Sequence, residues 1–468
     1  MPRPYTRAAG AVHRHGKDDT APLSQTLDRA RAWVAIRRPD DDSILVLHGG
    51  TLPSFELERS SSWQVVAPVN EAMLERHGLT VTTLRAAWLS EALDERLYEV
   101  ALTAGAIPPG SVRHNVADLG DALASLPPTV RSAIEAGALT PASGDLQPWY
   151  VPGWLSGMTA WIDERLSEAG LRRLEPIRQI RSWGRSALFR FQTDRGVVWA
   201  KEVPATFAHE IAVTGLLADV DPGFVPPLIA VDPTAGRLLM SHVAGPLLAD
   251  VSEREAWVAT MSRLAEIQRV LSAERDSLAV AGVAAAPLGT LAEATPRLLA
   301  DRELGRVGLE GGSDEATAAW LAGHADDLAQ ACLDLAAEGI PDSLDHGDLS
   351  PSQVIVGEMG PVIFDWSDAS ITNPFLSLGS FLSGPPGIPT GSRPAILDAY
   401  LRLWRDAMGE RDLERAVSLA EVVLPLHLAR LYRDRILPGL EQPWEMDRVV
   451  PRLLTTLATR LQDRTDVR

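Results

Sequence analysis

Apolar and polar positions in the first third of the chain follow patterns typical of a mixed α/β domain. Short apolar runs bounded by turn-forming residues predict strands, and apolar positions at helical spacing predict helices. The predicted strands cover residues 32–36, 44–47, 63–66, 80–89 and 96–103, and the predicted helices cover 69–77, 118–126 and 128–136. Gly78 follows the first helix directly and is a usual C-terminal stop. The pattern predicts a domain over residues 28–138, preceded by a polar, flexible leader over 1–27 with a later turn at 39–42.

A second pattern follows after a stretch that is rich in proline and glycine. Residues 139–157 contain three prolines and predict a linker, and residues 158–170 predict a helix. Together the linker and the helix form a predicted connecting segment over 139–173. The linker also contains Trp149, Tyr150 and Trp154. Aromatic side chains in a linker usually pack against a neighbouring domain, so we expect these three to be docked rather than free.

The remaining chain divides into a β-rich part and a helical part. Short apolar runs predict strands over 177–180, 187–191, 197–200, 228–231 and 237–240. Helical spacing then predicts helices over 257–271, 316–337, 397–408, 413–434 and 448–462, whereas residues 272–314 show no clear pattern and 383–394 predict an exposed loop. We therefore expect a small β-rich lobe over residues 174–244 and a mostly helical lobe over residues 245–468.

Composition and charge narrow the class of protein. The formal net charge of −18 disfavours binding to nucleic acid or to an anionic membrane, because both need a basic surface. The single cysteine, Cys332, lies in an alanine-rich helical stretch, which predicts a core residue in a reducing compartment. No apolar run is long enough to span a bilayer, and the N-terminus has no hydrophobic signal core. These features predict a cytoplasmic enzyme, and the arginine and alanine bias is typical of a GC-rich bacterial genome.

Lysine is scarce in this chain, which draws attention to the few positions that keep it. The sequence has 44 basic residues, of which only Lys17 and Lys201 are lysine. Lys201 directly follows the apolar run Val197–Ala200, so it belongs to a predicted strand. A compact ammonium beside a phosphate is one reason to need lysine rather than arginine, and a chance survival is the alternative.

Two downstream segments carry residues suited to phosphoryl transfer. The first is the loop Asp345-His346-Gly347-Asp348-Leu349-Ser350-Pro351-Ser352-Gln353, and the second is the strand Val362-Ile363-Phe364 followed by Asp365-Trp366-Ser367-Asp368. Phosphoryl transfer needs an acid to orient the acceptor hydroxyl, oxygen ligands for Mg²⁺, and a cation on the phosphates. Asp348 suits the first role, Gln353 and Asp365 the second, and Lys201 the third. Taken singly, Asp348 and Asp365 have the alternative of turn-forming residues.

These motifs resemble the aminoglycoside phosphotransferase and choline kinase group, which has the protein-kinase fold. The His346-Gly347-Asp348 and Phe364-Asp365-Trp366 sequences match that group's catalytic loop and metal-binding strand. The resemblance implies a two-lobed α+β fold, Asp348 as the catalytic acid/base, Asp365 as the main Mg²⁺ ligand, and Lys201 as the lysine at the α/β-phosphates. It also implies that Glu210 pairs with Lys201.

The resemblance is incomplete at several positions. The group's metal-binding asparagine is Gln353 here, which offers the same carbonyl on a longer side chain. Ser182-Trp183-Gly184-Arg185-Ser186 stands where the group folds a loop over the phosphates, and Ser182 and Ser186 are the candidate contacts, with an ordinary hairpin turn as the alternative. Met240 and His242 stand at the hinge that would hold the adenine edge, although His242 also suits a turn-capping role. Asp368 is the candidate for the acceptor side, with a loop role as the alternative.

The element order over residues 28–138 resembles a Nudix domain that has lost hydrolysis. Only Glu75 keeps an acid expected on the Nudix helix, while Arg76 and Trp63 stand where other carboxylates belong. A single carboxylate beside an arginine is a poor magnesium site. We therefore expect a degenerate α/β Nudix-like module without activity, which leaves homodimer formation or covering of the active site open as its role.

The sequence therefore predicts an ATP- or GTP-dependent kinase, with Mg²⁺ as cofactor, that phosphorylates a hydroxyl of a small molecule. An antibiotic, a sugar and an amino alcohol all remain open as acceptor, because residues 401–468 carry 11 acids and 12 arginines and are not an acidic surface. The alternative is a pseudokinase or ligand-binding regulatory protein without turnover. Nudix-type hydrolysis is the weakest alternative.

Overall fold

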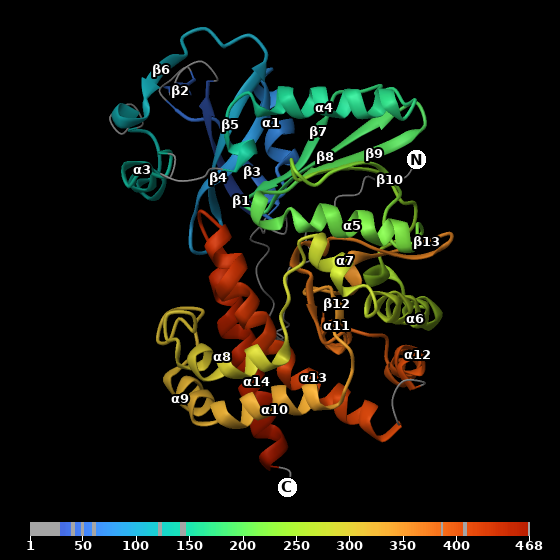
Figure 1. The fold of residues 1–468 in the computed structure, drawn as a ribbon. Helices are drawn as coiled ribbons and strands as arrows, with labels where there is room; N and C mark the ends of the chain where they lie inside the picture. The colour runs from blue at the N-terminus through green and yellow to red at the C-terminus, as the bar shows by residue number, and fades with distance from the viewer. Residues whose placement is uncertain are drawn as a thin grey trace. The chain divides into compact units, whose positions relative to one another are not determined.

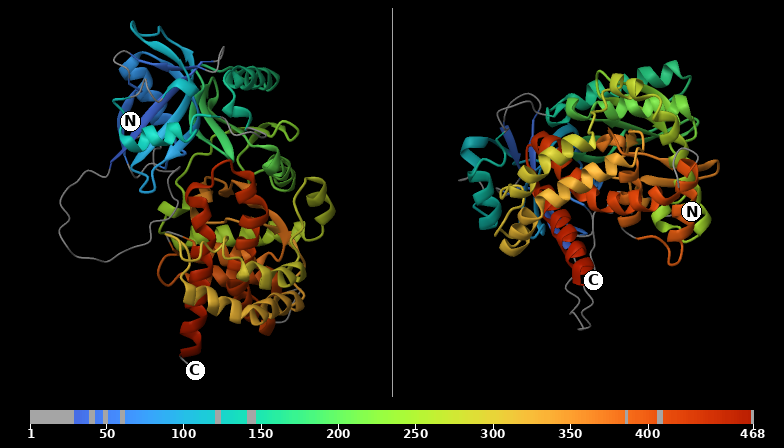
Figure 2. Two further views of the ribbon diagram at one scale, coloured as in Figure 1. Left: turned by 90° about the vertical axis from the view of Figure 1, so that its left-hand side faces the viewer. Right: turned by 60° about the horizontal axis from the view of Figure 1, so that its bottom comes forward.

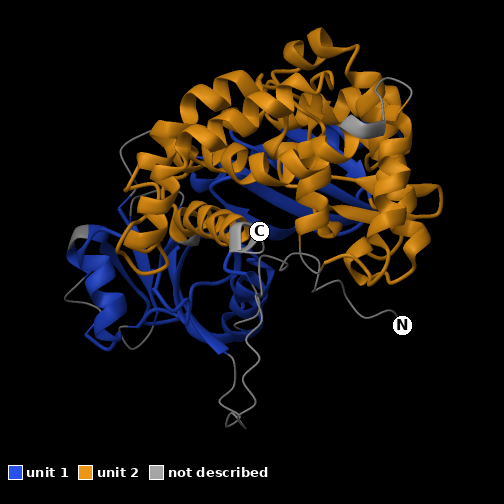
Figure 3. Cartoon of the chain, turned by 90° about the horizontal axis from the view of Figure 1, so that it is seen from below, with its two compact units in different colours: residues 1–204, 237–241 blue, residues 205–236, 242–468 orange. Residues whose placement is uncertain are grey.

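The computed structural model describes residues 29–38, 43–47, 51–58, 62–119, 124–140, 147–384, 387–405 and 410–466. The chain forms two compact units, coloured separately in Figure 3. Unit 1 is Met1–Pro204 with Arg237–Ser241, and unit 2 is Ala205–Gly236 with His242–Arg468. The predicted leader and the predicted turn at 39–42 lie outside the described residues. The predicted domain boundaries at residues 138, 173 and 244 stay predictions.

The first sheet of unit 1 confirms most of the strands predicted for the N-terminal part. Its strands are β1 (Arg29–Arg37), β2 (Ser43–Val46), β3 (Ser54–Glu58), β4 (Thr80–Leu89), β5 (Glu95–Ala104) and β6 (Val112–Asn115). Their order is β4-β5-β1-β2-β6, with β3 paired to β1, and β1 runs parallel to β5 (Figure 1). Helix α1 (Ala67–His77) ends at Gly78, whose φ of 66° is the left-handed conformation that glycine adopts without strain.

One predicted strand in this part is wrong. The strand expected over residues 63–66 is a turn with a single bridge, Val65 to Arg181, and the third strand of the sheet is β3. Trp63 and Val66 are buried, which explains the strand-like apolar pattern. The backbone of this segment hydrogen-bonds to strand β7 (Arg178–Trp183), where the Val66 N–H donates to the Ile180 carbonyl at 3.0 Å. Strand β6 was not predicted.

The second predicted helix of this part is only partly described. A 3₁₀ turn covers Val116–Asp118, and residues 120–123 lie outside the described part. Helix α3 (Pro128–Glu135) matches the third predicted helix and buries Val130 and Ile134.

A buried ion cluster fixes the sheet to the residues that follow α3. Glu99 accepts from Nε of Arg37 and, at 2.9 Å, from Nε of Arg85, and all three side chains are buried. Both arginines also donate to carbonyls, Arg37 to Leu139 at 2.6 Å and Arg85 to Ala138 at 3.1 Å. A buried charge is tolerated when it is paired and hydrogen-bonded in this way.

The second sheet of unit 1 carries the predicted lysine strand. Those of its strands that belong to unit 1 are β7, β8 (Ser186–Thr193), β9 (Gly196–Glu202) and β11 (Arg237–Ser241), in the antiparallel order β11-β9-β8-β7. Helix α4 (Trp154–Glu168) buries Met158, Ile162 and Leu166.

Trp149 and Trp154, two of the three linker aromatics, are docked as predicted. Trp149 is fully buried in the 3₁₀ turn Pro148–Tyr150, and its Nε1–H donates to the Trp183 carbonyl at 3.1 Å. Trp154 donates to Glu202 Oε1 at 3.1 Å and packs on Phe189, with 5.6 Å between ring centroids. These contacts hold the linker against strands β7, β8 and β9.

Unit 2 is mostly helical, in agreement with the sequence pattern (Figures 1 and 2). Its helices are α5 (His209–Val220), α6 (Arg254–Leu271), α7 (Arg275–Val280), α8 (Leu288–Ala300), α9 (Glu315–Gly323), α10 (Ala325–Ala337), α11 (Phe375–Ser383), α12 (Arg393–Arg405), α13 (Glu410–Leu431) and α14 (Val449–Asp466). Its strands are β10 (Leu228–Asp232) and two short antiparallel pairs, β12 (Ser343–Asp345) with β15 (Ser370–Thr372) and β13 (Val354–Gly357) with β14 (Gly360–Ile363). Within the described residues, no helix is long and apolar enough to cross a membrane.

Two features of unit 2 differ from the sequence expectation or were not predicted. The helix expected over residues 316–337 is two helices, because His324 adopts a non-helical backbone and its ring stacks on Trp320 at 4.0 Å. The unpatterned residues 272–314 contain α7 and α8. Cys332 is a core residue, as predicted, and burial raises the pKa of its thiol to about 11.

Candidate active site

The two predicted motifs lie side by side in unit 2 because two short antiparallel strand pairs, β12 with β15 and β13 with β14, hold them. Strand β12 leads into the loop that contains His346, Gly347 and Asp348, and β15 pairs with β12 shortly after the second motif. Strand β13 follows Gln353 directly and pairs with β14, which ends just before Phe364. The Phe364 N–H donates to the Gln353 carbonyl at 3.1 Å, so Gln353 and Asp365 flank the same end of this hairpin.

His346 holds the loop to the second motif through both ring nitrogens. Nε2 lies 3.2 Å from the Phe364 carbonyl, and the Asp348 N–H lies 3.4 Å from Nδ1. Because a carbonyl only accepts and an amide N–H only donates, the ring is neutral with its proton on Nε2. Burial lowers the pKa of His346, and the nearby Phe364 carbonyl and aspartates only partly oppose this shift. His346 therefore links the two motifs structurally. Its ring also packs on Trp366, with 4.5 Å between the ring centroids.

Gly347 and Asp365 have backbone conformations that bring the two motifs into close contact. Gly347 has a φ of +79°, and a Cβ atom there would lie 2.2 Å from the Asp368 carbonyl oxygen. Asp365 has a φ of 69°, which is uncommon for a residue with a side chain and is frequent at functional sites. The loop and the second motif can approach this closely only because residue 347 has no side chain.

Gln353 contacts the predicted catalytic carboxylate through its amide nitrogen. Its Oε1 accepts from the Ser350 N–H at 3.0 Å and from the Ser350 hydroxyl, and its Nε2 donates to Asp348 Oδ2 at 3.3 Å. The Ser350 N–H fixes which end of the amide is the oxygen, because it can only donate. The carbonyl oxygen that the sequence assigned to Mg²⁺ is thus bonded to Ser350 in this structure.

The donor atoms at this site fit a Mg²⁺ ion that arrives with a nucleotide. Magnesium is usually held by one or two carboxylates together with substrate phosphates and waters, and Asp365 offers such a carboxylate. Among the described residues, no group of three or more His, Cys, Asp or Glu side chains could hold a metal without a nucleotide. Asp368 is buried beside Gly347, with its backbone against the loop, and its predicted contact with the acceptor stays a prediction.

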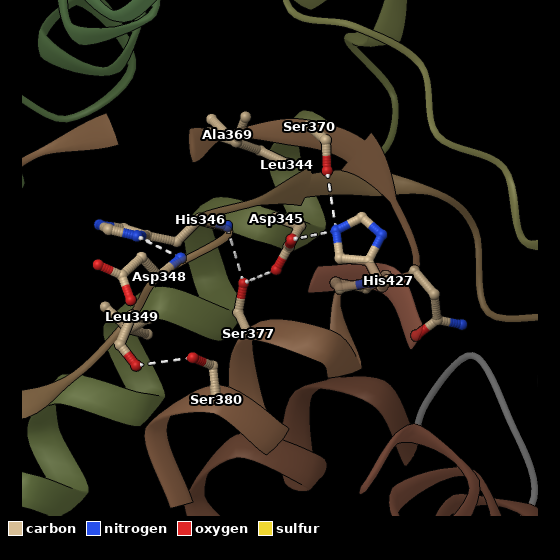
Figure 4. Close-up of polar contacts among 12 residues, drawn as sticks. Leu344, Asp345, His346, Asp348, Leu349, Ala369, Ser370, Ser377, Ser380 and His427 are labelled. Carbon is tan, nitrogen blue, oxygen red and sulfur yellow. Dashed lines mark hydrogen bonds and ion pairs between the residues drawn. The ribbon is translucent and has the colours of Figure 1, made fainter. Parts of the chain in front are cut away.

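A buried polar cluster beneath the loop was not predicted from the sequence. Asp345, Ser377 and His427 come from β12, α11 and α13. Ser377 and His427 each contact Asp345, and Ser377 also accepts the His346 N–H (Figure 4). The sequence signal for Asp345 was its place directly before the His346-Gly347-Asp348 motif. Nothing in the sequence linked the distant His427 to it.

Lys201 occupies the middle of the second sheet of unit 1. It pairs with Leu188 on β8 and with Leu238 on β11. Alternation along β9 places Lys201 on the same side as Trp199, which is the less buried side, while Ala200 and Glu202 are buried on the other. The predicted strand is present, Lys201 is half-buried on it, and its predicted role at a phosphate stays a prediction.

The candidate phosphate-loop serines are buried and already engaged. The Ser182 hydroxyl donates to the Leu84 carbonyl at 2.7 Å, and the Ser186 hydroxyl accepts from Trp183 Nε1 at 3.1 Å. These bonds hold the β7–β8 turn to strand β4 and to its own tryptophan. Their predicted role at a phosphate stays a prediction.

The other predicted nucleotide contacts are divided between the two units. Met240 lies on β11 in unit 1, opposite Trp199, whereas Glu210 and His242 belong to unit 2. Glu210 is buried in the first turn of α5. His242 is half-buried, and the chain after it packs on β13, where Val356 N–H donates to the Pro246 carbonyl at 2.9 Å.

A cavity of about 430 Å³ lies among the helices of unit 2. Its lining residues come from α11 to α14 and are Leu382, Ser383, Arg393, Glu421, Val422, Leu457, Arg460 and Leu461. Arg393 and Glu421 form an ion pair, so the charged lining is mixed rather than acidic.

Comparison with known proteins matches one part of the chain to a family. A family model described as the phosphotransferase enzyme family matches residues 177–413, which is half of the chain. None of the curated proteins compared with this chain matches it.

Several solved structures are similar at low identity. A macrolide 2'-phosphotransferase type I is 15% identical, with 63% of this chain and 96% of that chain covered and a TM-score of 0.41. The GDP complex of aminoglycoside 2'-phosphotransferase-IIIa is 18% identical, with coverages of 64% and 98% and a TM-score of 0.44. Choline kinase from Cryptosporidium parvum Iowa II is 12% identical, with coverages of 67% and 93% and a TM-score of 0.45. The family match over residues 177–413 is what decides the assignment: this chain belongs to the phosphotransferase enzyme family.

Proposed function

We propose that this protein is an ATP- or GTP-dependent kinase that transfers the γ-phosphoryl group to a hydroxyl of a small molecule. The observation that carries the proposal is the arrangement of Asp348, Gln353 and Asp365 around the β13–β14 hairpin in a chain of this family. The relatives named above act on macrolides, aminoglycosides and choline, which supports a small-molecule acceptor without choosing among antibiotics, sugars and amino alcohols.

In the proposed mechanism, the Asp348 carboxylate accepts a hydrogen bond from the acceptor hydroxyl and takes its proton as the new O–P bond forms. The bond between the γ-phosphorus and the bridging oxygen breaks, and the nucleoside diphosphate leaves with that oxygen. Gln353 Nε2 holds Asp348 Oδ2 in place. Lys201 would contact the α/β-phosphates and pair with Glu210.

Magnesium bound with the nucleotide would neutralise charge on the phosphates, and Asp365 would hold it. For Gln353 to serve as a second ligand, its Oε1 would have to release the Ser350 hydrogen bonds. Ser182, Ser186, Met240 and His242 remain minor nucleotide contacts in this proposal, and Asp368 a minor acceptor contact.

The test is Mg²⁺-dependent consumption of ATP and GTP with a panel of aminoglycosides, amino sugars, disaccharides and amino alcohols. We expect acceptor-stimulated turnover that falls by about a thousandfold or more in Asp348→Asn, which keeps the shape of the side chain but cannot take the proton. Wild-type rates in Asp348→Asn would contradict the assigned role.

Amine labelling gives an independent test of nucleotide binding, because the chain has only two lysines. We expect ATP with Mg²⁺ to protect Lys201 from an amine-reactive reagent while labelling of Lys17 stays unchanged as the internal control. Equal labelling of Lys201 with and without nucleotide would contradict the phosphate role.

A pseudokinase is the second candidate function. It is favoured by the engagement of the Gln353 oxygen with Ser350 and of the Ser182 and Ser186 hydroxyls with protein groups. It predicts nucleotide binding that does not depend on Mg²⁺, or no binding at all. Calorimetry that shows tight, Mg²⁺-dependent ATP binding would count against it.

For the N-terminal domain we propose a Nudix-like module without hydrolytic activity. Glu75 and Arg76 are exposed, Arg76 lies 5.5 Å from the Phe55 ring, and Glu71 forms an ion pair with Arg178. This arrangement supports a solvated helix face rather than a metal-binding carboxylate run. Release of phosphate or nucleoside monophosphate from nucleoside diphosphates by the full chain, retained in Asp348→Asn, would contradict it.

A further inference from the structure

We propose that His427, Asp345 and Ser377 form a positioning chain, a series of linked buried side chains that fixes the backbone of the catalytic loop. The three residues lie on different elements, α13, β12 and α11, and all are buried: Ser377 is 0%, Asp345 1% and His427 3% exposed. In Figure 4, the side chains of Asp345, Ser377 and His427 lie on one side of the loop and the Asp348 carboxylate lies on the other.

The first link joins Ser377 to the loop. The His346 N–H donates to Ser377 Oγ at 3.0 Å, and Ser377 Oγ donates to Asp345 Oδ1 at 2.6 Å. A hydroxyl has a single proton, and the amide can only donate, so the direction of both bonds is fixed. Ser377 therefore connects the Asp345 carboxylate to the backbone of the residue two positions before Asp348.

The second link holds the carboxylate itself. Asp345 Oδ2 lies 3.3 Å from His427 Nε2, which is an ion-pair distance without the alignment of a hydrogen bond. His427 Nε2 also lies 3.5 Å from the hydroxyl of Ser370, the residue that pairs with Asp345 between β12 and β15. Among the described residues, His427 is the only basic side chain within ion-pair distance of Asp345.

The burial of these groups restricts the geometry that the three side chains can adopt. A carboxylate removed from water is costly unless it is paired and hydrogen-bonded, so Asp345 favours the one geometry in which Ser377 and His427 both reach it. The Ser377 hydroxyl in that geometry sets the position of the His346 amide. Since the Asp348 N–H in turn contacts the His346 ring, the positioning chain fixes the start of the loop that bears Asp348.

The positioning chain also connects the loop to the helices that border the cavity. Helix α11 carries Ser377 together with Leu382 and Ser383 of the cavity lining, and α13 carries His427 together with Glu421 and Val422. A shift of either helix would therefore be transmitted to the His346 amide. The effect on the loop is independent of the proposed function, whereas an effect on turnover rests on it.

The experiment is hydrogen–deuterium exchange on the full chain, followed at peptides that contain the His346 amide. We expect Ser377→Ala and His427→Leu each to speed exchange at this amide by about tenfold or more, while most other amides of unit 2 change little. His427→Gln, whose side-chain N–H can reach the place of Nε2, should restore most of the protection. Thr260→Val is the matched control, because it removes an equally buried hydroxyl that bonds only to the Ala256 carbonyl of its own helix.

Unchanged exchange at His346 in His427→Leu would overturn the proposal. A uniform rise across unit 2 would also overturn it, because that result would mean general destabilisation rather than positioning. In the same variants, we expect kcat for ATP consumption to fall about tenfold to a hundredfold with KM for ATP within about twofold. A wild type that exchanges as expected but consumes no ATP with any acceptor would contradict the proposed function and leave the positioning chain intact.

Discussion

At the scale of single residues, Gly347 determines how closely the loop that contains Asp348 approaches the second motif. Its φ of +79° costs an L-residue energy, and an added Cβ atom would also meet the Asp368 carbonyl at 2.2 Å. We expect Gly347→Ala to lower the free energy of unfolding by about 3 kcal/mol or more and to abolish turnover, because the loop must move away from Asp368. Chemical denaturation and activity assays measure both effects.

The control for this substitution is Gly391→Ala. Gly391 has a similar φ of +75° but has no atom within 4 Å of an added Cβ. Its substitution should therefore cost only the backbone strain, about 1 kcal/mol. Equal losses in the two variants would show that the contact with Asp368 is unimportant.

His346 gives a pH prediction at the same scale. Burial lowers its pKa below the usual 6.5, so the unfolded chain binds more protons than the folded chain as the pH falls through this value. The stability contributed by the neutral ring is thus complete above pH 6.5 and declines below it. We expect His346→Asn, although less stable at neutral pH, to lose less stability than the wild type between about pH 7.5 and about pH 5.5. Thermal unfolding at both pH values is the measurement, and parallel losses would refute the idea.

At the scale of elements, the linker before α4 stabilises the β7–β8 turn by packing and hydrogen bonding to it. Trp149 is fully buried and donates to the Trp183 carbonyl. We expect Trp149→Phe to lower the free energy of unfolding by about 1–3 kcal/mol, since it loses both a buried hydrogen bond and ring volume. Val151→Ala, in the same linker but 48% exposed, should stay within about 0.5 kcal/mol of the wild type. Similar values for the two variants would mean that the docking of Trp149 contributes little.

The elements also show which parts of the structure could be predicted from the sequence. Strand β9 and the two polar motifs at 345–353 and 362–368 were found because their information is local: an apolar run, a turn, or a fixed order of polar residues. The segment Trp63–Val66 was misassigned because its burial mimics a strand, although it forms only one bridge to β7. The predicted helix over 316–337 is interrupted at His324, whose backbone is non-helical, and apolar spacing does not encode such a break.

The candidate site was predictable only in part, for a related reason. The sequence placed Asp348 and Asp365 together, but the pairing of Asp345 with His427 arises from packing between elements far apart in the chain. The orientation of the Gln353 amide depends likewise on Ser350, which the motif alone does not reveal.

At the scale of the whole molecule, the chain passes between the two units more than once. Residues 205–236 belong to unit 2, yet the following β11 returns to unit 1 and pairs with β9 from Arg237↔Glu202 to Ser241↔Val198. A protease site inserted between Pro204 and Ala205 should therefore give two fragments that stay together after cleavage. Size-exclusion chromatography with and without denaturant tests this. Separation of the 204/205 fragments under native conditions would contradict the prediction.

The return of β11 into unit 1 also bears on how such a protein can be rearranged by recombination. A unit encoded by one uninterrupted stretch can be exchanged as a cassette at a single junction. Here the lysine strand β9 takes a hydrogen-bonding neighbour from sequence that lies beyond the first 32 residues of unit 2. A chimera joined at residue 204 would therefore pair a donor β9 with a recipient β11. Exchange of unit 1 is expected to succeed only when residues 237–241 are exchanged with it, so the two segments should be inherited together.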